Sequence, residues 1–229
     1  MMKATFLLST LAFTADAATK VAVLEIGKGG VVRRTTSKRT ASSVVGVASF
    51  WGALHGRQLQ QPDMPLVPDL FNKADRSMIL GLTGVDFHAM PTLTSLMDNE
   101  AVGHMEVEGK HCKSLMNKVG PAKESSVKDA VVDAKMTMSA TGLNAMSLKV
   151  TEANSDAVEA QLQAILTALK AQATDGKTFV LHLVVEEEDE AAHRRLESRD
   201  LANDNNGKKP GKDLIEFCVL FSFFVHLFL

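Results

Sequence analysis

The sequence predicts an α/β fold, in which a single lumenal domain of mixed strands and helices is followed by a linker and a C-terminal apolar membrane segment. Strand-like and helix-like runs alternate along the middle of the chain, which is typical of an α/β layer. Each end of the chain is apolar, and the stretch between them has the length and polarity of one globular domain. We therefore divide the chain into a signal peptide over residues 1–17, a lumenal domain over 18–202, a linker over 203–213 and a membrane segment over 214–229.

The N-terminal segment has the three parts of a secretory signal peptide in the expected order. Lys3 supplies the positive charge, residues 4–13 form an apolar run, and Ala15-Asp16-Ala17 matches a cleavage site. The apolar run is too short to cross a bilayer as a helix. An uncleaved anchor or a buried first strand is the alternative. We expect cleavage after Ala17 and entry into the secretory pathway.

The C-terminal segment is apolar over residues 214–229 apart from Glu216, Ser222 and His226. As a helix it would extend roughly 24 Å, which is less than the ~30 Å hydrocarbon core of a bilayer. One interpretation is a transmembrane helix that the given sequence cuts short. Another is a short tail helix that thins the bilayer around it, and a C-terminal core helix is a further alternative.

A GPI-attachment signal is a separate interpretation of the same region. Asn205 and the two small residues after it form a candidate attachment site. Residues 208–216 then supply the polar spacer, and residues 217–229 supply the removable apolar tail. Under this interpretation the mature protein is a surface-anchored domain without a membrane helix.

Composition and cysteine content narrow the function classes. The net charge of −2 offers no basic surface of the kind that nucleic acid requires, so we expect no nucleic-acid partner. The two cysteines, Cys112 in the domain and Cys218 in the apolar tail, do not make a disulfide framework. We expect Cys112 to be a buried free thiol, with an intermolecular bridge as the alternative.

The first half of the domain contains two predicted strands. Residues 20–26 form an alternating run with β-branched side chains that ends at a glycine-rich turn, and residues 77–85 form a buried apolar run. Residues 41–54 contain many small residues and are compatible with a helix or a strand. Three prolines, Pro62, Pro65 and Pro68, predict a rigid loop before the second strand.

The second half contains the strongest helix and the clearest strand. After a loop around Pro91, we expect a short helix over 92–97 and a strand over 102–107, and Gly120-Pro121 breaks the chain. Helical periodicity covers 126–138 and, more strongly, 155–173, where Ser155 is the predicted cap. The run TFVLHLVV over 178–185 predicts a strand that the acidic residues 186–190 end, and a short helix is expected over 191–202.

His182 in the last strand is the most conspicuous titratable residue. Alternation places it on one face of the strand with Val180 and Val184. We expect a partly buried structural histidine, and the alternative is a pH-sensing role in an acidic compartment.

Candidate chemistry elsewhere is sparse, and we expect neither catalytic nor cofactor-binding residues. A cluster from His104 to Cys112 contains metal-ligand types, but its spacing matches no zinc motif, so we expect no metal. The sequence shows no pairing of a histidine with a nucleophile, which predicts a non-enzymatic protein. Arg194-Arg195, with Arg199 nearby, is a candidate processing site, and an exposed basic helix turn is the alternative.

Five segments together carry a family resemblance. They are GGVVR at 29–33, PLVPDLF at 65–71, RSMILGLTGV at 76–85, the helix at 156–173 and the strand at 179–185. In this order they resemble the V-type proton ATPase accessory protein 2 family, also called the (pro)renin receptor family. The dibasic stretch and the apolar tail stand where that family has its processing site and its membrane helix.

The resemblance implies a type I membrane protein in secretory-pathway membranes, which include the endoplasmic reticulum, endosome or lysosome, vacuole and cell surface. Its implied partners are subunits of the membrane sector of the V-type proton ATPase, whose assembly it would assist, together with membrane lipid. Its implied role is therefore in organelle acidification. Contact would run mainly through the tail helix, where Cys218 and Ser222 share a face and Glu216 and His226 need polar partners.

Overall fold

The computed structural model describes residues 18–34, 42–56, 66–69, 71–173 and 176–187, and these form a mixed α/β domain. The predicted α/β class is therefore confirmed for this part of the chain. The predicted signal peptide, linker and membrane segment lie outside the described residues. The strands of the main sheet are β1 Ala18–Gly27, β4 Arg76–Val85, β5 Gly103–Glu108, β6 Lys123–Glu124, β7 Leu143–Lys149 and β8 Thr178–Glu187.

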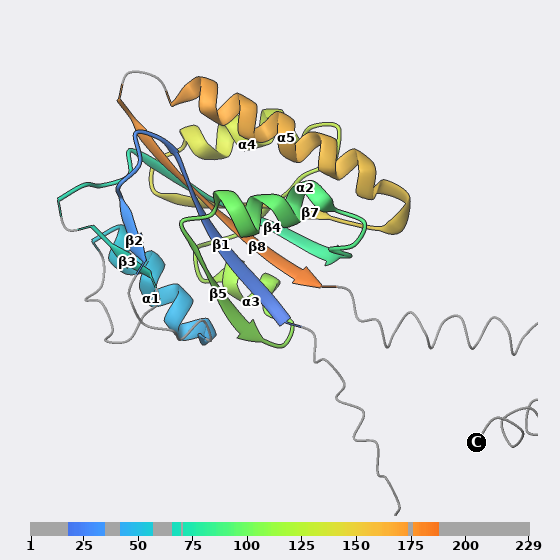
Figure 1. The fold of residues 1–229 in the computed structure, drawn as a ribbon, viewed down its shortest axis with the longest axis horizontal. Coiled ribbons are helices and arrows are strands. Elements are labelled where there is room, and N and C mark those ends of the chain that lie inside the picture. Colours follow the sequence, from blue (N-terminus) through green and yellow to red (C-terminus); the bar gives the residue numbers. More distant parts are fainter. Residues whose placement is uncertain (1–17, 35–41, 57–65, 70, 174–175, 188–229) are drawn as a thin grey trace, which may run out of the picture. The chain divides into compact units, whose positions relative to one another are not determined.

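The main sheet has the strand order β5-β1-β8-β4-β7-β6 (Figure 1). β1 is antiparallel to both of its neighbours, whereas β8, β4, β7 and β6 run parallel to one another. β8 lies at the centre, where Val23 of β1 and Ile79 of β4 flank His182 in register. A second, two-stranded sheet pairs β2 Val32–Arg34 with β3 Leu66–Pro68.

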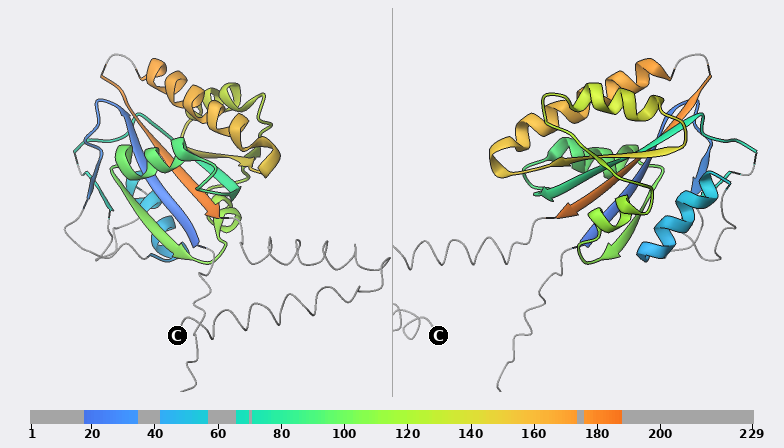
Figure 2. Two further views of the ribbon diagram at one scale, coloured as in Figure 1. Left: turned by 45° about the vertical axis from the view of Figure 1, so that its right-hand side comes forward. Right: turned by 180° about the vertical axis from the view of Figure 1, so that it is seen from behind.

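Helices cover both faces of the main sheet, so the described domain has three layers (Figure 2). We call one side the α5 face, because α5 packs there with α4 and α2, and the other the α1 face, because α1 packs there with α3 and the β2–β3 pair. The helices are α1 Val44–Leu54, α2 Pro91–Ser95 with the π-helical turn Leu96–Glu100, α3 Cys112–Asn117, α4 Ala130–Ser139, and α5 Ser155–Gln172 after the 3₁₀ turn Glu152–Asn154.

The two faces follow from side-chain alternation in the strands. In β8, Leu181 and Leu183 enter the α5 face, while Val180, His182 and Val184 enter the α1 face. Because both faces are covered, all side chains from Thr178 to Val185 are buried, as is typical of a central strand between helical layers.

The predicted strands over 20–26, 77–85, 102–107 and 178–185, and the predicted helix over 155–173, are confirmed within a few residues at each end. The undecided segment 41–54 contains α1. Its first turn is capped by Ser43, whose Oγ accepts a hydrogen bond from the Gly46 N–H at 3.0 Å.

Several predictions at the element ends were wrong. Ser155 does not cap α5, because the chain enters the helix through a 3₁₀ turn in which Thr151 and Asn154 form a capping box. Pro91, expected in a loop, is the first residue of α2, a position where the missing N–H of proline costs no hydrogen bond. Pro68, also expected in a loop, belongs to β3. The acidic run does not end β8 at once, since Glu186 and Glu187 still pair in the sheet.

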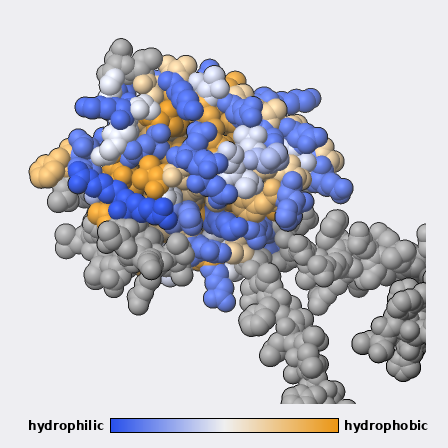
Figure 3. All heavy atoms as spheres, in the orientation of Figure 1, coloured by the Kyte–Doolittle hydropathy of each residue, from blue (hydrophilic) through white to orange (hydrophobic). Residues whose placement is uncertain are grey.

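The surface of the domain is mixed in character (Figure 3). In that view hydrophilic residues surround small, separate apolar groups. Over the described residues the large exposed apolar side chains are Val45, Phe71, Val132 and Met136. Val132 and Met136 are four residues apart on α4, so they are neighbours on its solvent side.

Candidate functional site: a buried histidine beneath helix α1

The candidate site is centred on His182, which has no solvent exposure. α1 covers the ring with two aromatic side chains from adjacent positions. The His182 ring meets Phe50 edge to face at 6.0 Å between centroids, and meets Trp51 in the same manner at 5.8 Å. Both aromatic side chains are themselves buried. The imidazole is therefore enclosed between the central strand and the inner side of α1.

Three polar atoms in this site have no hydrogen-bond partner. They are Nδ1 and Nε2 of His182 and Nε1 of Trp51. A neutral imidazole carries one donor and one acceptor, and an indole carries one donor. Each such group, buried without a partner, destabilises the fold by about 1–3 kcal/mol. Unpaired buried polar groups are rare in folded proteins, so this group of three requires an explanation.

The protonation state of His182 follows from its surroundings. Burial lowers the pKa of its imidazole to about 3, and the nearby His55 contributes in the same direction. The ring is therefore neutral at neutral pH. The expectation of a histidine that is only partly buried was wrong, because α1 completes an enclosure that the strand pattern alone does not reveal.

His55 and Ser77 form a second polar pair beside this site. The Ser77 Oγ lies 3.0 Å from the His55 Nε2. His55 follows the last turn of α1, and Ser77 lies near the start of β4. The expectation that no histidine pairs with a nucleophile was wrong, since 22 residues separate the two and no local motif connects them. The Ser77 side chain is shielded from solvent, at 1% exposure.

Cys112 lies on the same α1 face, where its Sγ is 3.6 Å from the carbonyl oxygen of Val184. It is buried and free, as predicted. Burial raises the pKa of its thiol to about 12, and the Glu186 carboxylate adds to the effect. The Cys112 N–H donates to Glu186 Oε2 at 3.1 Å. A thiol of this kind is structural and unreactive, because the thiolate is the reactive form.

The remaining metal-ligand types of the His104–Cys112 segment do not converge on one point. His104 and Glu106 pair in register with Ala22 and Lys20 of β1, and so lie on the α5 face, whereas Cys112 enters the α1 face. Among the described residues, no three His, Cys, Asp or Glu side chains are grouped closely enough to hold a metal ion.

A shallow polar groove of about 530 Å³ lies on the other side of the sheet, between α2 and α5. Along the groove, Gln163 Nε2 donates a hydrogen bond to Thr92 Oγ1 at 3.1 Å, and Lys170 forms an ion pair with Glu100 at 3.6 Å. The Glu159 carboxylate accepts hydrogen bonds from the first N–H groups of α2 and so fixes that helix against α5. The polar groups along this groove are largely paired with one another.

Other residues predicted from the sequence fall outside the described part of the chain. They are Arg194, Arg195 and Arg199 of the candidate processing site, Asn205 of the alternative GPI site, and Glu216, Cys218, Ser222 and His226 of the candidate membrane contact. Across the helices that the structure describes, none combines the length and apolar character needed to cross a membrane.

Comparison of the chain with protein-family models, curated proteins and solved structures finds no match.

Proposed function

We propose that this chain is a non-enzymatic lumenal accessory protein of the V-type proton ATPase, which assists assembly of the membrane sector and thereby organelle acidification. The proposal begins from the resemblance of five segments to the accessory protein 2 family. Its main structural support is that segments far apart in sequence form one unit. β4, which carries one block of the resemblance, pairs in parallel with β8, which carries another, and α5 packs on the same sheet.

The position of β1 also supports the proposal. The strand begins at Ala18, the residue after the predicted cleavage site, and its first residues pair with β5 and β8. Removal of residues 1–17 would therefore leave every described strand intact. β8 runs antiparallel to β1, so its last residues lie at the same end of the sheet as Ala18.

The non-enzymatic part of the proposal rests on the burial of the candidate nucleophiles, which keeps a substrate from reaching them. The one serine–histidine pair that the described residues bring together is shielded from solvent at Ser77, and a nucleophile must reach its substrate. The buried thiol of Cys112 is held in its unreactive protonated form.

The test is purification of the full chain from membranes in mild detergent, followed by intact-mass measurement and identification of co-purifying proteins. We expect the apolar tail to be retained and membrane-sector subunits of the proton pump to accompany the chain. A double variant, Cys218→Phe with Ser222→Phe, would fill the small-residue face of the tail and should release those subunits. Leu220→Phe, which would lie on the opposite face of the proposed tail helix, is the matched control and should retain them.

A surface protein attached through GPI is the second candidate, favoured by the spacing from Asn205 through the polar stretch to the apolar tail. The same mass measurement separates the two. A mass that ends near Asn205 with a glycolipid attached, and no pump subunits, would refute the accessory-protein proposal.

A further inference from the structure

We propose that α1 is an acid-released cover: protonation of His182 in an acidic lumen detaches α1 from the sheet while the six-stranded sheet stays folded. The biological setting rests on the proposed function, which places the domain in a compartment that the pump acidifies. The physical mechanism rests only on the packing around His182. Three features of that packing lead to the proposal.

The first feature is that the closed site has no means to accept a proton. Both ring nitrogens of His182 lack partners, and the rings of Phe50 and Trp51 meet the imidazole edge to face. A protonated imidazole carries two donors and a charge, and a buried charge without a partner is strongly disfavoured. Proton uptake must therefore be accompanied by exposure of the ring to water.

The second feature is that no acidic group among the described residues is placed to pair with the charged ring. α1 itself contains no charged side chain, and His55 at its end would add a like charge. The β1 carboxylate on this face, Glu25, already accepts the N–H groups of residues 30–32. The β8 carboxylate, Glu186, accepts the N–H of Cys112 in α3.

The other elements around the site offer no counter-charge either. β4 contributes the hydroxyl of Ser77, and α3 contributes the Cys112 thiol, which stays protonated. In the β2–β3 region, Asp69 is paired with Arg33. A proton on His182 is thus unfavourable as long as α1 is in place.

The third feature is that α1 can leave without breaking the sheet. Its buried side is mainly apolar, with Val47, Phe50, Trp51 and Leu54 beside Ser49. The hydrogen bond between His55, at the end of α1, and Ser77 of β4 involves side chains and is not part of the strand pairing. The backbone bond next to α1, from Ser42 N–H to Glu106 O, joins the edge strand β5 and lies outside the pairing of the main sheet. Local opening of such a unit is less costly than unfolding of the domain.

The expected size of the response follows from linkage. With α1 closed the pKa of His182 is about 3, and its ordinary value is 6.5. Acidification from about pH 7 to about pH 5 should therefore raise the open-to-closed ratio of α1 by about 25-fold. Above about pH 7.5 the ratio is nearly insensitive to pH, because most rings are then neutral in both states.

Hydrogen–deuterium exchange of the full-length protein in detergent measures this ratio. After correction for the intrinsic pH dependence of exchange, protection of residues 44–54 should fall about 25-fold between pH 7 and pH 5. Protection of β4 and α5 should be unchanged. Trp51 is the only tryptophan in the chain, so acrylamide quenching of its fluorescence should increase over the same pH range.

Two histidine variants make the test specific. His182→Leu should abolish the pH response of residues 44–54, whereas His104→Leu, on β5 and on the other face of the sheet, should leave it intact. A response that persists in His182→Leu, or equal loss of protection in α1 and α5, would overturn the proposal. If His182→Leu does not fold, the wild-type measurement still decides, because unchanged protection of residues 44–54 at pH 5 contradicts it. Pump subunits that co-purify without an α1 response would refute only this inference.

Discussion

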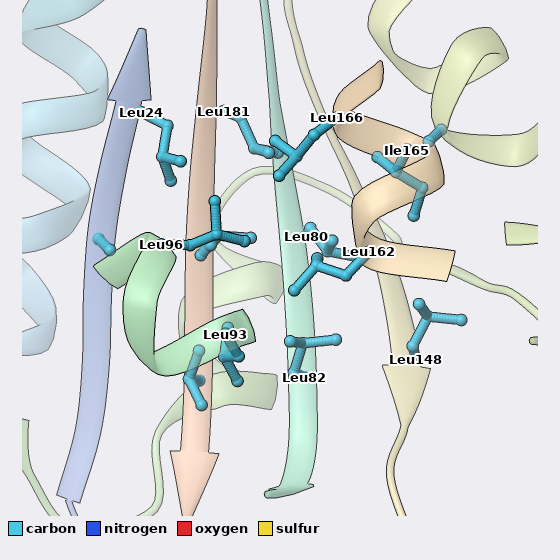
Figure 4. Packing of buried hydrophobic residues seen from close by; sticks show 14 of the residues in the cluster. Leu24, Leu80, Leu82, Leu93, Leu96, Leu148, Leu162, Ile165, Leu166 and Leu181 are labelled. Atoms are coloured by element: carbon cyan, nitrogen blue, oxygen red, sulfur yellow. The ribbon is translucent and has the colours of Figure 1, made fainter. Parts of the chain in front are cut away.

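The two faces of the main sheet bury different kinds of side chain. On the α5 face, buried leucines and other apolar side chains from β1, β4, β7 and β8 meet those of α2 and α5 (Figure 4). On the α1 face, α1 and α3 cover a layer that includes an unpartnered histidine and a tryptophan whose N–H is also unpartnered. Leu80 and His182 lie on adjacent strands of one sheet, and yet they face these two different environments.

The difference indicates a division of labour within one domain. Close packing of apolar groups stabilises both faces. The unpartnered groups of His182 and Trp51 reduce stability on the α1 face. The α5 helix carries one such atom, Gln172 Oε1, at its last residue. Such a cost is expected where a region must change state, since functional sites are drawn from the less stable parts of a fold. Three measurements sharpen or break this comparison.

The largest expected effect is the loss of a central side chain on the α5 face. Leu162→Ala should lower the free energy of unfolding by about 2–5 kcal/mol, because Leu162 is fully buried and its removal leaves a cavity. Urea denaturation measures the loss. The loss should be the same at pH 7.4 and pH 5, because the core around Leu162 consists of apolar side chains.

Val45→Ala is the control for Leu162→Ala. Val45 is on α1 but 62% exposed, so its truncation should change stability by less than about 0.5 kcal/mol. A cost for Leu162→Ala that differed strongly between the two pH values would show that the α5 face also senses pH, and the division of labour would be wrong.

The next effect is the pH dependence of stability that His182 contributes. Its folded pKa, about 3, lies below the ordinary 6.5, so the unfolded chain binds the proton more readily. His182 therefore leaves the free energy of unfolding undiminished above pH 6.5. As pH decreases toward 3, that free energy falls by at most about 1.4 kcal/mol per pH unit. Between pH 6.5 and pH 5 the difference between wild type and His182→Leu should change by up to about 2 kcal/mol.

Two aspartates with lowered pKa values do not interfere in this window. Backbone N–H groups of Asn72 and Phe71 lower the pKa of Asp69, and hydrogen bonds from Lys123 and Ser125 lower that of Asp133. Their contribution to the free energy of unfolding is present above their ordinary pKa of 3.8, and it is lost only as pH falls through the lower pKa values of the folded state. Parallel stability curves of wild type and His182→Leu from pH 6.5 to pH 5 would contradict the assignment to His182.

The sequence predicts the α5 face better than the α1 face, for a physical reason. A long amphipathic helix and strongly apolar strands have periodic patterns of their own, and α5, β4 and β8 follow them. β7 went unrecognised because LNAMSLK lacks β-branched residues, and its conformation depends on parallel pairing with β4. α3, with six residues, is too short to show a helical period.

The sequence predicts the position of His182 in the candidate site but does not predict the residues that enclose it. Alternation in the last strand assigns His182 to one face, but its burial depends on Phe50 and Trp51, more than a hundred residues earlier in the chain. The segment that contains them was undecided between helix and strand, because its small residues carry little periodic signal. The pairing of His55 with Ser77 likewise exists only after α1 has packed on the sheet.

The smallest expected effect concerns the outer side of the α5-face layer. Met136 on α4 is 53% exposed, and Val132, one turn before it, is 58% exposed. Met136→Gln keeps a good helix former and removes an apolar group that water already reaches, so the free energy of unfolding should change by less than about 0.5 kcal/mol.

Met138→Gln, two residues on but fully buried, is the matched contrast and should lower the free energy of unfolding several times more, because it buries an amide. Urea denaturation of both variants at pH 7.4 compares the two sides of α4. A loss above about 1 kcal/mol for Met136→Gln would mean that the outer side of α4 is covered in solution, and the stability of this layer would then not come from its inward side alone.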